Sequence, residues 1–100
     1  MRVVKWQWNY LQKHIGGLGR LIGGVPGVKP ADVLVLGGGV AGFNAARMAA
    51  GLEANVTILE RSPDKIRELD DYFAGRAQIL YSTTDTLEKY AAEADIVIGA

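Results

Sequence analysis

The sequence contains no cysteine among its 100 residues. This absence excludes disulfide frameworks, thiol nucleophiles and thiolate metal sites. Histidine is nearly absent as well, since His14 is the only one and no acidic residue lies close to it in the sequence. A nucleophilic triad or a histidine-based metal site therefore has little support. We expect no metal site and no catalytic residue in this chain.

An excess of charge of one sign is also lacking, because eleven basic residues balance eleven acidic ones. The electrostatic signature of a nucleic-acid-binding protein is therefore missing. Long apolar runs are absent too, and Trp6, Gln7, Trp8 and Asn9 stand where a secretory peptide would need an apolar core. The expectation is a single small cytoplasmic domain without nucleic-acid or membrane partners.

From Asp32 onward, short apolar runs rich in β-branched residues alternate with longer periodic runs. This pattern is typical of parallel strands joined by helices. Two right-handed crossovers followed by a return to the other side of the first strand give the order 3-2-1-4. The predicted fold class is α/β, a Rossmann-like parallel sheet of four strands flanked by helices, the truncated half of a dinucleotide-binding domain. The predicted strands are 33–36, 55–60, 77–82 and 95–99.

The three intervening runs predict helices with recognisable ends. Ser62 and Pro63 are a typical N-cap and first helical residue. Gly75 follows the last periodic residue of the same helix, where a left-handed C-terminal cap is expected. Asp85 and Glu88 have the spacing of a capping box, which predicts the start of the third helix.

Two regions follow from this division, an N-terminal segment with a Gly/Pro-rich linker (1–31) and the half Rossmann domain (32–100). Residues 4–10 alternate apolar and polar side chains as in a strand, but a helical stripe also fits, and periodicity alone does not decide. We favour a core or partner contact for the aromatic residues of this segment over a stacking platform. The helical stripe consists of Val4, Trp8, Leu11 and Ile15.

The strongest motif is G-x-G-x-x-G, formed by Gly37, Gly39 and Gly42 between a predicted strand and a predicted helix. In nucleotide-binding folds the first glycine allows the tight turn, the second lets a pyrophosphate approach, and the third lets the helix pack closely. The anion would meet free amides at the positive end of the helix dipole. The alternative is a tight turn with no ligand.

Glu60 strengthens the nucleotide interpretation because it ends the second predicted strand, about 20 residues after the glycines, where an acid would accept hydrogen bonds from the adenosine ribose. The alternative is a solvated carboxylate paired with Arg61 or Lys65. An acid at this position also repels a ribose 2′-phosphate, so NAD is favoured over NADP, although Arg61 weakens that preference.

The sequence also resembles the NAD-binding domain of alanine dehydrogenase from about residue 10 to residue 100. The resemblance rests on YLQKH (10–14), GGVPGVKPADVLVLGGGVAG (23–42), AARMAAGL (45–52), ANVTILE (54–60), DKIRELDDYFAGRAQILYS (64–82) and EADIVIGA (93–100). GGVPGVKPA before the glycines is not a general feature of nucleotide-binding folds. Residues 1–9 do not resemble the family.

The resemblance implies a cofactor, NAD, and a set of binding residues. It places Glu60 and Lys65 beside the adenosine ribose and Ser82 on the adenine side. Glu60 stands where the family usually has aspartate, and Glu53 replaces a glycine common in the family, which would strain the helix end if a positive φ is needed there. The residues implied for the pyrophosphate turn are Gly37, Gly39, Val40 and Gly42.

The expected function is that of an NAD(H)-binding domain fragment unable to oxidise alanine. In the family, the alanine-handling arginine, lysine and histidine belong to a separate N-terminal region, and a catalytic aspartate follows later. The alternatives are an adenine-nucleotide-sensing or structural oligomerisation module, and a small enzyme such as a phosphate-ester hydrolase. Because the fourth strand would be an exposed sheet edge, we also expect a homo-oligomer formed through that edge or through the N-terminal aromatic segment.

Overall fold

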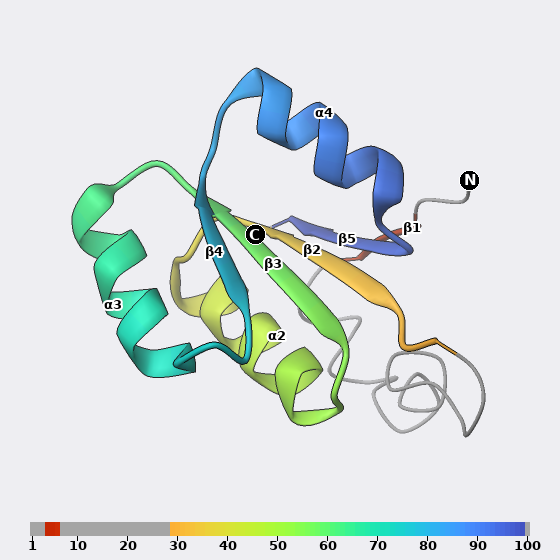
Figure 1. The fold of residues 1–100 in the computed structure, drawn as a ribbon, viewed down its shortest axis with the longest axis horizontal. Coiled ribbons are helices and arrows are strands. Elements are labelled where there is room, and N and C mark those ends of the chain that lie inside the picture. Colours follow the sequence, from red (N-terminus) through yellow and green to blue (C-terminus); the bar gives the residue numbers. More distant parts are fainter. Residues whose placement is uncertain (1–3, 7–28, 100) are drawn as a thin grey trace.

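The computed structural model describes residues 4–6 and 29–99, which form one parallel sheet with helices on both faces (Figure 1). The order of the four predicted strands is confirmed, and each observed boundary lies within one residue of the predicted one. A fifth strand adjoins them, so the order is β1-β5-β2-β3-β4. The strands are β1 (Val4–Trp6), β2 (Asp32–Leu36), β3 (Asn55–Glu60), β4 (Gln78–Tyr81) and β5 (Ile96–Gly99).

Three helices connect these strands, α2 (Val40–Gly51), α3 (Pro63–Phe73) and α4 (Thr84–Glu93). Figure 1 shows α2 and α3 on one face of the sheet and α4 on the other. This arrangement follows from right-handed crossovers, because α2 and α3 carry the chain outward from β2 while α4 brings it back across the sheet. No helix in the described part of the chain has the length and apolar character that crossing a membrane requires.

The pairing of β1 corrects the expectation that the fourth predicted strand is an open edge. β1 runs parallel to β5, with Val4 opposite Ile96 and Trp6 opposite Ile98. An apolar strand exposes backbone donors and acceptors at its edge, and a neighbouring strand satisfies them. The strand alternative is therefore correct for Val4–Trp6. Association through an exposed β5 edge loses its basis, and homo-oligomerisation through the N-terminal segment stays a prediction.

The core is thickest on the α2 and α3 face. Ala45, Ala46 and Ala49 are fully buried, and their small side chains let α2 lie close to the sheet. Leu69 and Phe73 of α3 complete this layer. The α4 face holds a smaller cluster, and no residue within α4 is fully buried. The packing of α2 and α3 on this face therefore fixes the start of α2 relative to β2 and β3.

The ends of α3 follow the sequence prediction, with one difference at its C-terminal end. Ser62 is the N-cap, and its hydroxyl accepts a hydrogen bond from the Lys65 amide at 3.3 Å. At the other end Ala74, rather than Gly75, is the first left-handed residue, with φ +48°, and Gly75 continues the turn with φ +90°. The predicted left-handed conformation of Gly75 is therefore confirmed, and the left-handed turn begins one residue earlier than predicted, at Ala74.

The start of α4 also differs from the prediction. The capping box is formed by Thr83 and Thr86, not by Asp85 and Glu88. The Thr83 hydroxyl accepts from the Thr86 amide at 3.1 Å, and the Thr86 hydroxyl accepts from the Thr83 amide at 2.8 Å. Threonine therefore fills the role that glutamate or glutamine usually has at the third helical position.

Glu53 lies where the chain turns out of α2 toward β3, and its φ is +65°. The sequence-based expectation of strain at this position is confirmed, because an L-residue with a side chain is disfavoured in the left-handed region. We expect Glu53→Gly to raise the free energy of unfolding by about 1 kcal/mol, measured by urea denaturation.

A matched control for Glu53→Gly is Asp71→Gly, an exposed position in the last turn of α3. This substitution removes the same charge but introduces glycine where φ is helical, and it should lower stability by about 1 kcal/mol. Equal effects of the two substitutions would contradict backbone strain at Glu53.

Candidate functional site

The three glycines of the G-x-G-x-x-G motif, two in the turn between β2 and α2 and one in the first turn of α2, differ in what they require. Gly37 has φ +90°, and its amide donates to the Leu59 carbonyl at 2.9 Å. A Cβ on Gly42 would lie 2.2 Å from the Gly37 carbonyl oxygen. Gly39 has an ordinary extended conformation, with φ −67° and ψ −177°. Within the described residues, a Cβ on Gly39 would meet no heavy atom within 4 Å.

The first turn of α2 leaves backbone donors free. Gly39 is the N-cap without a side chain, and the first turn carries no acidic residue. The first helical bond is donated by Phe43 to the Gly39 carbonyl at 2.7 Å, so the Val40 and Ala41 amides have no acceptor among residues 29–99. Val40 is 81% exposed. The positive end of the helix dipole is therefore open to a negatively charged group.

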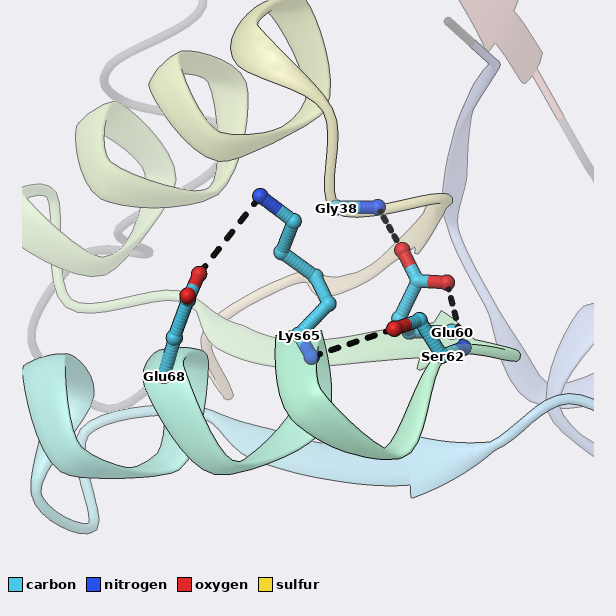
Figure 2. Close-up of polar contacts among 5 residues, drawn as sticks. All are labelled: Gly38, Glu60, Ser62, Lys65 and Glu68. Carbon is cyan, nitrogen blue, oxygen red and sulfur yellow. Dashed lines mark hydrogen bonds and ion pairs between the residues drawn. The ribbon is translucent and has the colours of Figure 1, made fainter.

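Glu60 at the end of β3 faces the same turn (Figure 2). Its Oε1 accepts a hydrogen bond from the Gly38 amide at 2.8 Å. Its Oε2 accepts from the Arg61 amide at 2.6 Å and from the Ser62 amide at 2.9 Å. The carboxylate therefore joins the glycine turn to the first residues of the β3–α3 connection. The alternative of an ion pair with Arg61 or Lys65 is not what the structure contains.

These amides also determine the charge state of Glu60. The hydrogen bond from the Ser62 amide is the main reason that its pKa lies below the usual 4.5, and the Gly38 and Arg61 amides and the nearby Lys65 charge act in the same direction. Partial burial opposes them, because desolvation disfavours the charged form. Glu60 is therefore a fixed, ionised hydrogen-bond acceptor at neutral pH.

Lys65 and Ser82 both lie near Glu60. Lys65 is in the first turn of α3, and its ammonium pairs with the Glu68 carboxylate at 3.6 Å. Figure 2 shows the Lys65 side chain extending toward the start of α2. Ser82 follows β4, and its amide donates to the Glu60 carbonyl at 2.9 Å. All the residues implied for nucleotide binding therefore lie at the carboxyl ends of β2, β3 and β4.

A pocket of about 220 Å³ opens between the start of α2 and α3. Its lining consists of Gly38, Gly39, Val40, Phe43, Lys65, Glu68 and Leu69. A larger hollow of about 480 Å³ lies at the opposite ends of the strands, beside Asp32, Asn55 and Gln78. Ligands of open α/β sheets bind at the carboxyl ends of the strands, so the smaller pocket belongs to the candidate site.

Gly38 is the functional residue that sequence reasoning missed. Besides donating to Glu60, it has no room for a side chain, since a Cβ would lie 2.6 Å from Leu69 Cδ1 and 3.1 Å from Glu60 Oε1. The run of three glycines at 37–39 was the available signal, because the G-x-G-x-x-G pattern does not need glycine at its second position.

Two predicted features cannot be placed. His14 and most of the Gly/Pro-rich linker fall outside the described residues, as do Trp8 and Tyr10. Among residues 4–6 and 29–99, no group of three or more histidine, aspartate or glutamate side chains is arranged to hold a metal ion.

Comparison with known proteins gives one consistent result. The family described as "Alanine dehydrogenase/PNT, C-terminal domain" matches residues 4–100. The alanine dehydrogenase of Halomonas elongata is 53% identical over 90 residues, which are 90% of this chain and 24% of that protein. The alanine dehydrogenase of Mycobacterium tuberculosis is 53% identical over 91 residues, which are 91% of this chain and 24% of that protein.

A solved structure agrees with these sequence matches. An L-alanine dehydrogenase superposes with a TM-score of 0.74 at 45% sequence identity, over 89% of this chain and 25% of that chain. The chain therefore spans about a quarter of the length of the relatives it matches.

The amides around Glu60 predict a pH-dependent contribution to stability. Because folding lowers its pKa, the stabilisation is present above the usual value of 4.5 and is lost as pH falls through the lowered pKa. We expect Glu60→Gln to lower the free energy of unfolding by about 1–2 kcal/mol at pH 7, since a neutral amide accepts more weakly and places NH₂ against backbone donors.

This difference between parent and Glu60→Gln should shrink as the pH falls below 4.5. Urea denaturation at pH 7, 4.5 and 3 measures it, and Glu88→Gln on α4 is the control for charge alone. A difference that stays constant over this range would contradict the role given to the carboxylate.

Proposed function

Because the chain belongs to the alanine dehydrogenase/PNT C-terminal domain family, we propose that it is an NAD(H)-binding domain fragment. The cofactor's pyrophosphate would lie over Gly39 at the start of α2, and its adenosine ribose would lie at Glu60. The proposal is supported by the family match together with the geometry of the turn, in which free donors and an ionised acceptor lie side by side.

The observation that carries this proposal is the space beside Gly39. The backbone conformation of Gly39 suits any residue, and within the described part of the chain no atom would meet a side chain there. Neither the turn nor the packing therefore explains glycine at this position, in contrast to Gly37 and Gly42. A ligand that approaches the backbone closely does explain it.

The residues present suit the two polar parts of a dinucleotide. The Val40 and Ala41 amides can donate to a pyrophosphate, with the helix dipole adding to the attraction. Among the described residues, only the Gly38 amide donates a hydrogen bond to Glu60 Oε1, which leaves a second acceptor position for a ribose hydroxyl. Bound NAD supplies hydride-transfer chemistry, and these residues hold and orient it.

The first test is a titration with NADH in which binding is measured by calorimetry and by the fluorescence of the nicotinamide. We expect saturable binding and a rise in Tm with ligand concentration. Gly39→Val should weaken binding at least tenfold while lowering the free energy of unfolding by at most about 1 kcal/mol, because its side chain fills the ligand's space and an N-cap change has only this modest effect.

Gly51→Ala is the matched control, since residue 51 has equal room for a Cβ but lies at the far end of α2. Absence of NADH binding by the parent chain would overturn the proposal. Binding of ADP as tight as that of NADH, with no gain from the nicotinamide half, would replace it with an adenine-nucleotide module.

We further propose that these 100 residues do not oxidise alanine by themselves. The resemblance assigns the alanine-handling side chains to a region separate from the nucleotide domain. The described site contains backbone donors, the Glu60 and Glu68 carboxylates and the Lys65 ammonium. An assay with NAD and L-alanine, monitored through NADH absorbance, should show no turnover under conditions where NADH binds. Turnover that Gly39→Val abolishes would contradict this.

A further inference from the structure

The pocket between α2 and α3 begins next to the ribose-binding carboxylate. A Cβ built on Gly38 would lie 3.1 Å from Glu60 Oε1 and 3.2 Å from Lys65 Cγ. Glu60 and Lys65 therefore converge on Gly38, which is itself part of the pocket lining. A group attached to a ribose hydroxyl that is bound at Glu60 would therefore lie next to this pocket.

Two opposite charges lie in the wall of this pocket. The Lys65 ammonium and the Glu68 carboxylate are 3.6 Å apart, one helical turn from each other on α3 (Figure 2). Both stay accessible, since the Lys65 side chain is 42% exposed and that of Glu68 is 70% exposed. The pair is therefore weak and can be broken by a stronger anion. While it lasts, Glu68 compensates Lys65, the only cation that the described residues contribute to the lining.

Glu60 repels a nearby anion less strongly than its position suggests. Three backbone amides donate to its two oxygens, so its charge is partly compensated by oriented dipoles. Glu68 makes no such contacts with backbone amides in the described residues. Of the two acids near the pocket, Glu68 is therefore the one whose charge is compensated, among the described residues, only by the exposed Lys65 ammonium.

We propose that Glu68 is a specificity-determining residue that makes the pocket unfavourable to a ribose 2′-phosphate, both by repelling it and by holding the Lys65 ammonium. This inference rests on the proposed function, because it concerns the choice between NAD(H) and NADP(H) at the same site. In the parent chain the 2′-phosphate meets an ion pair of Lys65 and Glu68 that carries no net positive charge. Without the Glu68 charge, Lys65 becomes a phosphate-binding cation.

The test is the ratio of the Kd for NADPH to the Kd for NADH, measured by calorimetry at low salt. Glu68→Gln should lower this ratio about three- to tenfold relative to the parent, chiefly through tighter NADPH binding. The effect should decrease at 0.5 M salt, because exposed charges are screened there. Circular dichroism verifies that α3 is retained, as expected for an exposed helical position.

Two further variants identify the cause of the change. Glu88→Gln on α4 alters the net charge by the same amount, away from the pocket, and should leave the ratio unchanged. The double variant Lys65→Met with Glu68→Gln should lose most of the gain of the single variant, because the cation that would bind the phosphate is gone.

The outcomes separate the two proposals. If the parent chain binds NADH, and the ratio of the two Kd values falls in Glu68→Gln but not in Glu88→Gln, the role of Glu68 is supported. If the parent chain binds NADH but Glu68→Gln leaves the ratio of Kd values unchanged, the role of Glu68 is overturned and the proposed function stands. The same conclusion follows if Glu88→Gln lowers the ratio equally. A parent chain that binds neither nucleotide overturns both.

Discussion

The turn from β2 into α2 closes only because residue 42 has no side chain. The Gly37 carbonyl oxygen occupies the space that a Cβ on Gly42 would need, with 2.2 Å between the two positions. This contact brings the first turn of α2 to the end of β2, while the alanines at 45, 46 and 49 keep the rest of the helix close to the sheet. The free amides at the start of α2 lie where they do because of this packing.

Glu60 couples this turn to the neighbouring strand. Its carboxylate accepts from Gly38 on one side and from Arg61 and Ser62 on the other, so one side chain sets the position of two loops. A residue that organises the site before any ligand arrives reduces the conformational entropy lost on binding. In the proposed function the same residue therefore has a structural and a recognition role, and substitutions at Glu60 would affect both.

The sequence was sufficient for the features that depend on local pattern. The bounds of β3 and the N-cap at Ser62 follow from residue type and spacing. The positive φ of Glu53 was indicated by the family resemblance, because the family commonly has glycine at that position. The start of α4 was missed because several polar residues compete for the same capping role. The hydrogen bond from Gly38 to Glu60 and the pairing of β1 with β5 depend on the folded chain, since each joins residues far apart in the sequence.

The pairing of β1 with β5 has a consequence for how the chain folds. β2, β3 and β4 pair through successive crossovers of modest length, whereas Val4 and Ile96 are separated by nearly the whole chain. Contacts between distant residues form slowly, because loop closure carries an entropic cost before any contact offsets it. During synthesis the first strand emerges from the ribosome well before its partner does, so this edge of the sheet is completed last.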